Sequence, residues 1–402
     1  KEMKNRWFLL SLLLIFGLAL ASCGDSGSET PQTDTEETTP ADTTETEPAE
    51  EAVVEEVEEE DTAVEDIAAE ADVTGIAQIR IAVVMPSTVT DLAWSQAVYD
   101  SLLRLQAEAG GPDVMEIAYT ENMFNVTDAA AAMRDYAADG FNIVLAHGTQ
   151  YGTSMFEIAP DFPETTFAWG TAVDTGAELG LTNVFAYEAR AEEGGYVNGV
   201  LAANLSTSGV IGVVGPVEAG DAKLYIDGFV AGAMAANPDI QVNVSYTGSF
   251  GDTALAAEAA NTQIAAGADV LTGSAQQVVG AIGVAAEQGV PWLGTQSDQS
   301  PIAPDVVVAS QLYNWDGVLS DIIRKHQAGE YGGTAYALTL GNSGLVMDYA
   351  DGLDGEAVAA AMVAANDIIA GAIDVNAIIA GEAPAAADAG DEEMMIEYPE
   401  IE

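Results

Sequence analysis

The sequence predicts an α/β fold with two lobes, each built around a parallel sheet that helices cover on both faces. From Gln78 onward, short runs rich in β-branched residues alternate with longer alanine-rich segments. Apolar strands that alternate with helices of this length are typical of parallel sheets wrapped on both faces. The pattern continues for roughly 270 residues, which is more than one ordinary doubly wound domain holds, and we therefore expect two lobes.

The individual elements follow from the same alternation. Strands are expected at the apolar runs Arg80–Met85, Val114–Thr120, Asn142–His147, Thr166–Trp169, Val184–Tyr187, Val210–Val214, Val242–Tyr246, Asp269–Gly273, Trp292–Thr295 and Val306–Gln311. Helices are expected at the segments between them, Leu92–Ala109, Val126–Asp139, Gly152–Ala159, Glu193–Leu205, Leu224–Ala236, Thr253–Ala266, Val279–Gln288 and Trp315–Ala328.

Residues 1–23 have the pattern of a lipoprotein signal peptide. Lys1, Lys4 and Arg6 precede the apolar run Trp7–Leu20, whose 14 residues fall short of the ~20 that a membrane-spanning helix needs. The run leads into Leu20-Ala21-Ser22-Cys23, which is similar to a bacterial lipobox and holds the only cysteine of the sequence. We expect Cys23 to be acylated and to anchor the chain in a membrane. The alternative is a plain secretory signal with an incidental cysteine.

The segment after Cys23 is predicted to be a disordered acidic tether, residues 24–75. Between Gly24 and Thr74 there are 20 Asp or Glu residues and neither Lys nor Arg. Such a composition cannot bury enough apolar surface to offset the entropy lost on ordering. Residues 383–402 are also acidic and are expected to form a loose tail.

The charge of the folded part excludes several classes of partner. Of the 65 acidic residues, 44 lie after Thr74, and of the ten basic residues seven do, so the formal charge of that part is −37. Nucleic-acid binding needs Lys and Arg for phosphate contacts and is excluded. The same field would repel nucleotides and other polyanions, so a neutral ligand is favoured.

The ligand of such a fold binds outside the carboxyl ends of the strands. The loops at these ends carry aromatic, amide and hydroxyl side chains, single acids and little basic charge. They are Pro86–Trp94, Glu121–Phe124, Gly148–Tyr151, Gly215–Lys223, Phe250–Thr253, Ser274–Val278 and Gln296–Pro301. This chemistry suits a planar, polar, neutral molecule.

The same loops and their flanks carry a resemblance to a known family. Characteristic segments include IRIAVVMPSTVTDLAWSQAVYDSL, NVFAYEARAEEGGYVNGVLAANL and GADVLTGSAQQVVGAIGVAAEQGVPWLGTQSDQS. They resemble the basic membrane protein family of lipoproteins, which includes purine nucleoside receptors, from about Ile79 to Met347. The resemblance implies the type I periplasmic-binding-protein fold, in which two Rossmann-like lobes are joined by three crossovers. It puts the first crossover near Tyr187–Arg190 and the second near Ala309–Tyr313.

On this resemblance we expect an N-terminal lobe of residues 76–187 plus about 312–341, and a C-terminal lobe of residues 188–311 plus about 342–382. The implied function is that of an extracytoplasmic solute-binding lipoprotein. It would capture a purine nucleoside or nucleobase between the lobes and deliver it to an ABC permease, with no metal and no cofactor.

Two aromatic residues are implied to sandwich the base. Trp94 lies in Asp91-Leu92-Ala93-Trp94-Ser95, which matches the family segment whose aromatic residue stacks on the ligand, and Asp91 and Ser95 flank it. Phe250 matches the stacking aromatic of the other lobe. Asp252 either contacts the ligand or caps the helix at Thr253, and Asp91 is also expected to cap a helix. We expect an open cleft to leave both rings partly solvated.

Further polar candidates come from the remaining loops. They are Gln150, Tyr151, Gln276, Gln296, Asp298 and Tyr313. Gln296 replaces an acid of the family, Tyr313 lies where family members often have Lys, and an Asp that many nucleoside receptors carry near Pro86 is missing. These departures leave a free base open as the ligand. His147, at the end of an apolar strand, is interpreted as a structural histidine.

Three other functions are compatible with parts of the sequence. A ligand-binding sensor would use the same closure, and a sugar or another small neutral solute is a further possible ligand for such a fold. A nucleoside hydrolase that works with carboxylates alone is the least favoured. The sequence has two His and neither HExxH, GxSxG nor GxxxxGK[ST], so the usual nucleophile, metal and phosphate motifs are missing.

Overall fold

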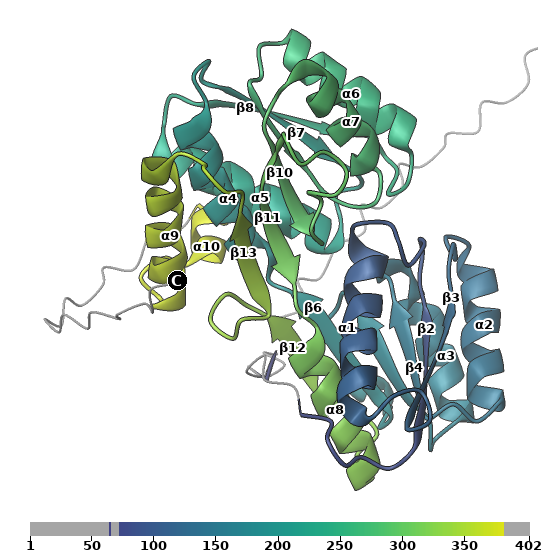
Figure 1. Ribbon diagram of the computed structural model, residues 1–402. Coiled ribbons are helices and arrows are strands. Elements are labelled where there is room, and N and C mark those ends of the chain that lie inside the picture. The colour runs from purple at the N-terminus through teal and green to yellow at the C-terminus, as the bar shows by residue number, and fades with distance from the viewer. Residues whose placement is uncertain (1–63, 66–71, 382–402) are drawn as a thin grey trace, which may run out of the picture. The chain divides into compact units, whose positions relative to one another are not determined.

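The computed structural model describes residues 64–65 and 72–381 (Figure 1). They contain two sheets. The first has the strand order β1 (Val64–Glu65), β12 (Ala335–Leu338), β6 (Val184–Ala189), β5 (Thr166–Gly170), β4 (Ile143–His147), β2 (Ile79–Val84), β3 (Met115–Thr120). The second has the order β13 (Leu345–Tyr349), β11 (Val307–Tyr313), β10 (Trp292–Gln296), β9 (Val270–Gly273), β7 (Val210–Gly215), β8 (Gln241–Tyr246). We call the parts of the chain around them the N-terminal and the C-terminal lobe.

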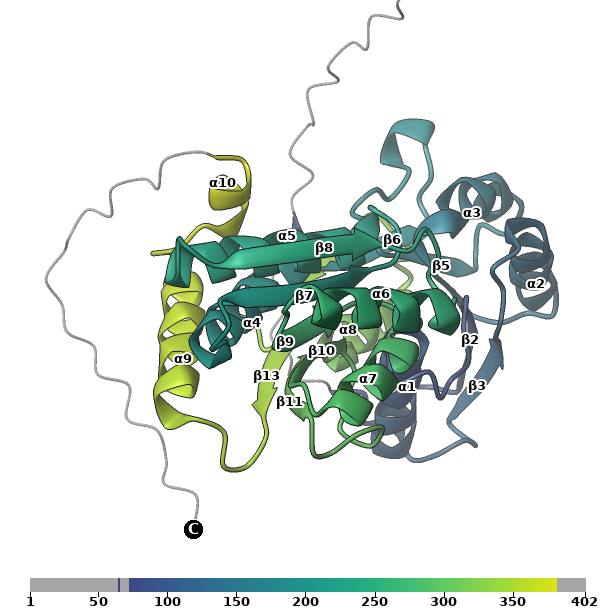
Figure 2. The same ribbon diagram turned by 90° about the horizontal axis from the view of Figure 1, so that it is seen from above.

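Helices follow most strands and cover both faces of the sheets. They are α1 (Trp94–Ala109), α2 (Val126–Ala138), α3 (Gly152–Ile158), α4 (Ala191–Leu205), α5 (Gly220–Ala236), α6 (Thr253–Ala265), α7 (Val278–Gln288), α8 (Asp316–Ala328), α9 (Gly355–Ile369) and α10 (Val375–Ile379). In the C-terminal lobe, α6 and α7 lie on one face of the sheet, while α4 and α5 lie on the other (Figures 1 and 2). None of the helices in residues 72–381 is long and apolar enough to cross a membrane.

The chain passes between the two sheets three times. It leaves the first sheet after β6, returns to it for β12 after β11, and ends in the second sheet with β13. All strand pairs are parallel except β11–β13, which is antiparallel. Two parallel sheets with three connections are the predicted type I periplasmic-binding-protein fold, and this prediction is confirmed.

The ten predicted strands and eight predicted helices are all present, with ends that differ by a few residues. Five strands and α-helices were not predicted: β1, β12, β13, α9 and α10. The short run at β12, Ala-Tyr-Ala-Leu, is too short to show a periodicity of apolar residues that would indicate either a strand or a helix. It becomes a strand because its backbone pairs with β6 from Ala335↔Ala186 to Leu338↔Ala189.

The prediction that residues 24–75 form a disordered tether is wrong for the C-terminal end of this segment. Val64–Glu65 pairs in parallel with β12, the Val73 side chain is fully buried, and Asp72 forms an ion pair with Arg324. The edge of the first sheet offers free backbone groups that an approaching segment can pair with. The signal peptide, Cys23, the rest of the tether and the tail 383–402 lie outside the described residues.

Both faces of each sheet are buried, so the strands are apolar without strict alternation. In β2, Ile81 and Val83 face the helices α1 and α8, while Ala82 and Val84 face α2 and α3. Successive side chains of a strand point to opposite faces, so a continuous apolar run is what a doubly covered parallel strand requires.

Helices α4 and α5 pack at an unusually short distance because each presents glycine to the other. A Cβ atom on Gly199 would lie 2.1 Å from the Phe229 carbonyl oxygen, and one on Gly232 would lie 2.0 Å from the Tyr196 carbonyl oxygen. Both distances are far below van der Waals contact. The backbones of the two helices therefore touch directly and form a rigid layer against the second sheet.

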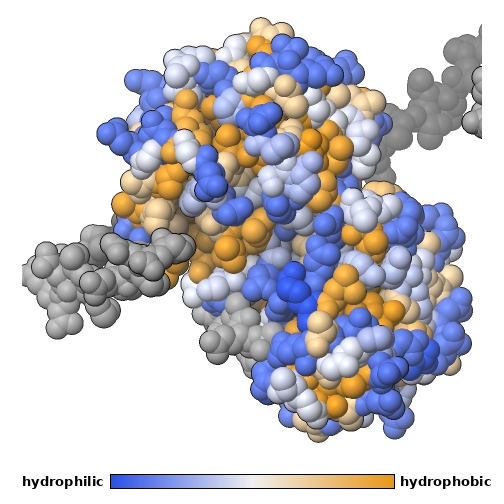
Figure 3. Space-filling model, viewed as in Figure 1, coloured by the Kyte–Doolittle hydropathy of each residue, from blue (hydrophilic) through white to orange (hydrophobic). Residues whose placement is uncertain are grey.

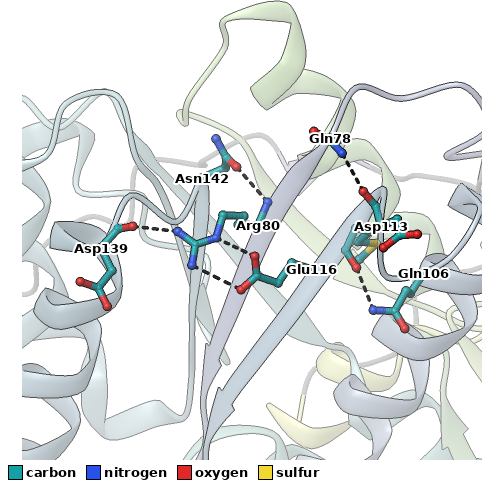
Figure 4. Close-up of polar contacts among 8 residues, drawn as sticks. Gln78, Arg80, Gln106, Asp113, Glu116, Asp139 and Asn142 are labelled. Atoms are coloured by element: carbon teal, nitrogen blue, oxygen red, sulfur yellow. Dashed lines mark hydrogen bonds and ion pairs between the residues drawn. The ribbon is translucent and has the colours of Figure 1, made fainter.

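Every basic residue after Thr74 forms an ion pair with a carboxylate. The pairs are Arg80–Glu116, Arg104–Asp316, Arg134–Asp161, Arg190–Glu188, Lys223–Asp227, Arg324–Asp72 and Lys325–Asp321. Figure 4 shows the first of them, in which Arg80 also donates to the Asp139 carbonyl oxygen at 2.7 Å. Seven bases against 44 acids leave most carboxylates without a cation, and hydrophilic and apolar residues are interspersed on the surface in Figure 3.

Candidate ligand-binding site

A cavity of about 370 Å³ lies between the two lobes at the carboxyl ends of the strands. The N-terminal lobe lines it with Pro86, Trp94, Phe124, Gly148, Thr149, Gln150 and Thr171. The C-terminal lobe lines it with Asp221, Ala222, Phe250, Ala275, Gln276 and Gln296. The position is the one expected for ligands of parallel sheets.

The lobes touch each other beside this cavity. Ser297 Oγ donates to the Ala93 carbonyl oxygen at 2.8 Å, and Gln299 Nε2 donates to that of Leu92 at 3.4 Å. Elsewhere Gly220 of α5, with φ +59°, approaches two threonines of the other lobe, so that a Cβ on it would lie 2.9 Å from Thr149 Oγ1. These contacts enclose the cavity, and glycine at position 220 permits the approach.

Trp94 lines the cavity from the start of α1 and is anchored from behind. Its ring is parallel to that of His147, with centroids 4.0 Å apart and planes inclined by 8°. Its Nε1 donates to the His147 carbonyl oxygen at 3.1 Å, and Tyr313 and Trp315 meet it edge-on. The side chain is only 4% exposed. With the lobes in contact, three aromatic neighbours cover the ring. That an open cleft leaves it partly solvated stays a prediction.

His147 holds the Trp94 ring in place, as expected of a structural histidine. Its Nε2 donates to the Trp94 carbonyl oxygen at 3.2 Å, and its Nδ1 lies 2.8 Å from the hydroxyl of Tyr187. Burial lowers the pKa of His147 to about 3, so the ring is neutral and Nδ1 accepts from Tyr187. A neutral imidazole fixed by two hydrogen bonds gives the indole a defined plane.

Two phenylalanines from opposite lobes form the outer wall of the cavity. Phe250 lies on the loop between β8 and α6 and is half-buried, while Phe124 follows β3 and is 47% exposed. Both also line an outer groove. Phe124 Cζ would lie 3.2 Å from a Cβ on Gly251, so the two loops are close. Phe250 is where the sequence predicts a stacking residue, and Phe124 was not predicted.

Among the residues that the structure describes, Asp221 is the only charged one that lines the cavity, and it lies in the first turn of α5. Its Oδ2 accepts hydrogen bonds from Gln296 Nε2 at 2.8 Å and from the Tyr313 hydroxyl at 3.0 Å. Burial raises the pKa of Asp221, and the hydrogen bonds from Gln296 and Tyr313 oppose the shift. Among the described residues, no Lys, Arg or His lines the cavity, so the site offers a buried acid without a cation.

Several polar atoms around the cavity are buried without a partner. Gln276 Oε1 and Gln296 Oε1 have no hydrogen-bond partner within the part of the chain that the structure describes. Both residues line the cavity. A buried acceptor without a donor costs about 1–3 kcal/mol. Gln296 and Ala275 also have positive φ, +76° and +69°, a conformation that non-glycine residues rarely adopt outside functional sites.

The other predicted site residues do not line the cavity. Asp91 accepts hydrogen bonds from the backbone N–H groups of Ala93, Ser95 and Gln96 and so stabilises the start of α1, although the N-cap residue is Ala93 and the helix begins two residues later than predicted. Asp252 caps α6 through the N–H groups of Ala254 and Leu255, which is one of its two predicted roles. The remaining four are buried behind the wall or lie in outer grooves: Ser95, Tyr151, Asp298 and Tyr313.

Tyr151 and Tyr313 support the site from a second layer. The Tyr151 hydroxyl donates to the Met123 carbonyl oxygen at 2.7 Å, and Met123 immediately precedes Phe124. The Tyr313 hydroxyl donates to Asp221. Both side chains are therefore connected to residues that line the cavity.

Most lining residues that were not predicted individually lie in loops that were predicted to surround the ligand. Phe124, Thr149 and Asp221 belong to the loops Glu121–Phe124, Gly148–Tyr151 and Gly215–Lys223. Asp221 lies in the first turn of a helix, where an acid is ordinarily explained by the helix dipole. Thr171 follows β5, whose loop was not selected. The rule that ligands bind at strand ends could have found it.

Comparison with known proteins identifies the family. Residues 78–378 match the profile of Bmp, described as ABC transporter substrate-binding protein PnrA-like. This stretch is most of the chain and includes both lobes. The chain belongs to this family.

Individual curated proteins and a solved structure are also similar to this chain. The chain is 31% identical over 225 residues to a purine-binding protein of Brucella abortus, and the match covers 56% of this chain and 62% of that protein. It is 26% identical over 268 residues to the transcriptional activator protein med of Bacillus subtilis, with 66% of this chain and 80% of that protein covered. A solved structure of an ABC transporter solute-binding protein from Conexibacter woesei has a TM-score of 0.60 at 23% identity. It covers 74% of this chain and 98% of that one. The chain thus spans less than two thirds of the Brucella protein.

Metal binding has no support in the described residues. Residues 64–65 and 72–381 contain no group of three or more His, Cys, Asp or Glu side chains that could hold an ion. The polar groups at the cavity are amides, hydroxyls and a single carboxylate. They can bind an organic ligand through hydrogen bonds.

Proposed function

We propose that this chain captures a purine nucleobase or nucleoside in the cavity and delivers it to an ABC permease. The observation that carries the proposal is the lining itself: aromatic rings from both lobes surround amides and an acid, and no described residue adds a cation. Aromatic faces and amide groups suit a flat heterocycle with both donors and acceptors. A cavity with one acid and no base does not suit a phosphate. The name of the Brucella relative supports the same class of ligand.

The contacts between the lobes support a closure mechanism. Trp94 and Phe250 come from opposite lobes, so a ligand touches both only when the lobes are together. A ligand that binds the closed arrangement better than the open one shifts the population toward closure. A permease could then distinguish the loaded protein from the empty one by the relative position of the lobes.

Replacing Phe250 with alanine tests this mechanism. Stacking of an aromatic residue on a base contributes on the order of 1–3 kcal/mol, so the Kd of the best purine should rise roughly 5- to 150-fold. The melting temperature of the ligand-free protein should change little, because Phe250 is only half-buried. Isothermal titration calorimetry and thermal melts measure the two quantities.

The matched control is Phe162→Ala. Phe162 is also half-buried, but it packs in the N-terminal lobe and does not line the cavity. Its removal should leave the Kd unchanged. Equal affinities of wild type and Phe250→Ala would exclude Phe250 as a stacking residue, and failure of all purine bases and nucleosides to bind would refute the proposed ligand class.

We further propose that the protein acts outside the cytoplasm on a lipid anchor at Cys23. The supporting observation is the sequence Leu20-Ala21-Ser22-Cys23 after a basic and apolar leader. In cells, Cys23→Ser should move the protein from the membrane fraction to the soluble fraction, because the acyl chains are lost. Purine affinity should remain. Retention of the variant in membranes after a high-salt wash would contradict the anchor.

A sensor is the second candidate function, and the similarity to a protein named as a transcriptional activator favours it. A sensor would use the same cavity and the same closure, but would present the closed form to a signalling partner. Deletion of the gene separates the two roles. Loss of purine uptake supports transport, whereas normal uptake with altered gene expression supports sensing.

A further inference from the structure

Buried acceptor oxygens in the cavity determine which edge of a purine can bind there, because that edge must donate hydrogen bonds to them. We infer that Asp221 and Gln296 together read two adjacent hydrogen-bond donors, the N1–H and 2-amino groups of guanine or its nucleoside. This inference rests on the proposed function, because it concerns the same cavity and assumes a purine in it. It adds the chemical group that determines which purine is preferred.

Asp221 is a buried acceptor to which only neutral groups donate. The residue is 7% exposed, and both side chains that donate to it, Gln296 and Tyr313, are neutral and donate to the same oxygen, Oδ2. Burial of a carboxylate without a cation is costly unless donors surround it. A ligand that brings donors would offset this cost, whereas a ligand that brings only acceptors would increase it.

The orientation of Gln296 is determined by its bond to Asp221. Since Nε2 donates to the carboxylate, the other end of the amide, Oε1, is left as an acceptor, and it has no partner among the described residues. The side chain is 2% exposed and lines the cavity. Its amide group is hydrogen-bonded to the carboxylate of Asp221. The Asp221 carboxylate and Gln296 Oε1 therefore form a pair of neighbouring acceptors.

Gln276 adds a third acceptor to this side of the cavity. Its Oε1 is also buried without a partner, and the residue is 8% exposed. All three side chains come from the C-terminal lobe, at the ends of β7, β9 and β10. This side of the cavity therefore presents three acceptor groups to which a ligand can donate.

Among common purines, guanine has the edge that complements two neighbouring acceptors. Its N1–H and 2-amino groups are adjacent donors, the arrangement that binds a carboxylate well. Adenine alternates a donor with an acceptor along each edge, and hypoxanthine has N1–H beside a carbonyl oxygen and a C–H. Hypoxanthine differs from guanine only in lacking the 2-amino group, which makes it the sharpest comparison.

Calorimetry with two matched pairs tests the inference: guanosine against inosine, and guanine against hypoxanthine. A hydrogen bond to a charged group contributes about 1.5–3 kcal/mol, so the amino compound of each pair should bind roughly 10- to 150-fold more tightly. Use of both pairs makes the result independent of whether the ligand is a base or a nucleoside.

Asp221→Asn and Gln296→Leu assign the preference to these side chains. Either change should remove most of the guanosine-to-inosine ratio, mainly by weakening guanosine, because one acceptor of the pair is replaced. Asp252→Asn is the control, since this carboxylate caps α6 and does not line the cavity; it should keep the full ratio. A thermal melt of each variant verifies that it is folded, and if Asp221→Asn does not fold, Gln296→Leu gives the same readout.

The outcomes separate this inference from the proposed function. Equal affinities within both pairs, a preference for adenine, or a ratio unchanged in both variants would overturn the inference and leave purine binding intact. Absence of binding by all purines would overturn both.

Discussion

Replacing Trp94 with alanine should lower both the stability of the protein and its affinity for purines. The ring is almost fully buried, stacks on His147 and meets Tyr313 and Trp315 edge-on. Truncation of such a residue typically costs about 3–5 kcal/mol of the free energy of unfolding. The same ring lines the cavity, so the loss of stacking should raise the Kd as well, by roughly 5- to 150-fold.

Urea denaturation of the ligand-free protein and calorimetry with the best purine measure the two effects. Trp292→Phe serves as the control, because Trp292 is fully buried in the C-terminal lobe and does not line the cavity; it should lose stability but retain affinity. Wild-type stability of Trp94→Ala would contradict the packing behind the ring. Wild-type affinity in a folded variant would show that Trp94 does not contact the ligand.

Replacing Gly232 with alanine should destabilise the C-terminal lobe strongly although only a methyl group is added. The new Cβ would lie 2.0 Å from the Tyr196 carbonyl oxygen. In Gly228→Ala, the Cβ would lie 2.1 Å from the Glu192 carbonyl oxygen. The atom that the new Cβ would clash with belongs to the backbone of α4. No change of side-chain rotamer can remove this clash, so α4 must move away from α5. Overpacking typically costs about 1–3 kcal/mol and occasionally more, and a backbone obstacle puts this variant at the upper end.

Gly283→Ala is the matched control for the glycine substitution. Gly283 lies in the interior of α7, and a Cβ there would meet no atom within 4 Å. Alanine is the better helix former, so this variant should gain roughly 0.5–1 kcal/mol. Opposite signs of the two changes in urea denaturation are the expected result. A gain of stability in Gly232→Ala would show that α4 and α5 are not in backbone contact.

Much of the fold could be predicted because it depends on local patterns. Apolar runs such as Ile79–Val84, with short loops and long alanine-rich segments between them, are sufficient to indicate covered parallel strands. The prediction failed where an element depends on its neighbours. Leu345–Tyr349 becomes the antiparallel edge strand β13 because it pairs with β11, and the four-residue run at β12 is a strand because β6 lies beside it.

Part of the site could be predicted in the same way. Trp94, Gln150, Phe250, Gln276 and Gln296 all line the cavity, since the ends of parallel strands meet at one edge of a sheet. Asp298 could not be judged from the sequence, because an acid in a loop can face either the cleft or solvent. In the structure it accepts from the backbone N–H of Ser300 and lies in an outer groove.

Asp221 was the most important residue that the sequence left undecided. An acid in the first turn of a helix is already explained by the N–H groups and the dipole there, so nothing local assigns it to a ligand. Its role in the cavity depends on Gln296 and Tyr313, which are 75 and 92 positions away in the sequence.

The sequence by itself determined the α/β class, the succession of strands and helices, the acid-rich character that excludes nucleic acid, and the loops from which a site could be built. These properties depend on composition and on periodicities of a few residues, which each segment carries independently. The tertiary structure determined which loop residues face each other across the lobes, which ring is buried and which acceptors lack a partner. These properties arise only when distant segments exclude water from the same space, and no single segment contains that information.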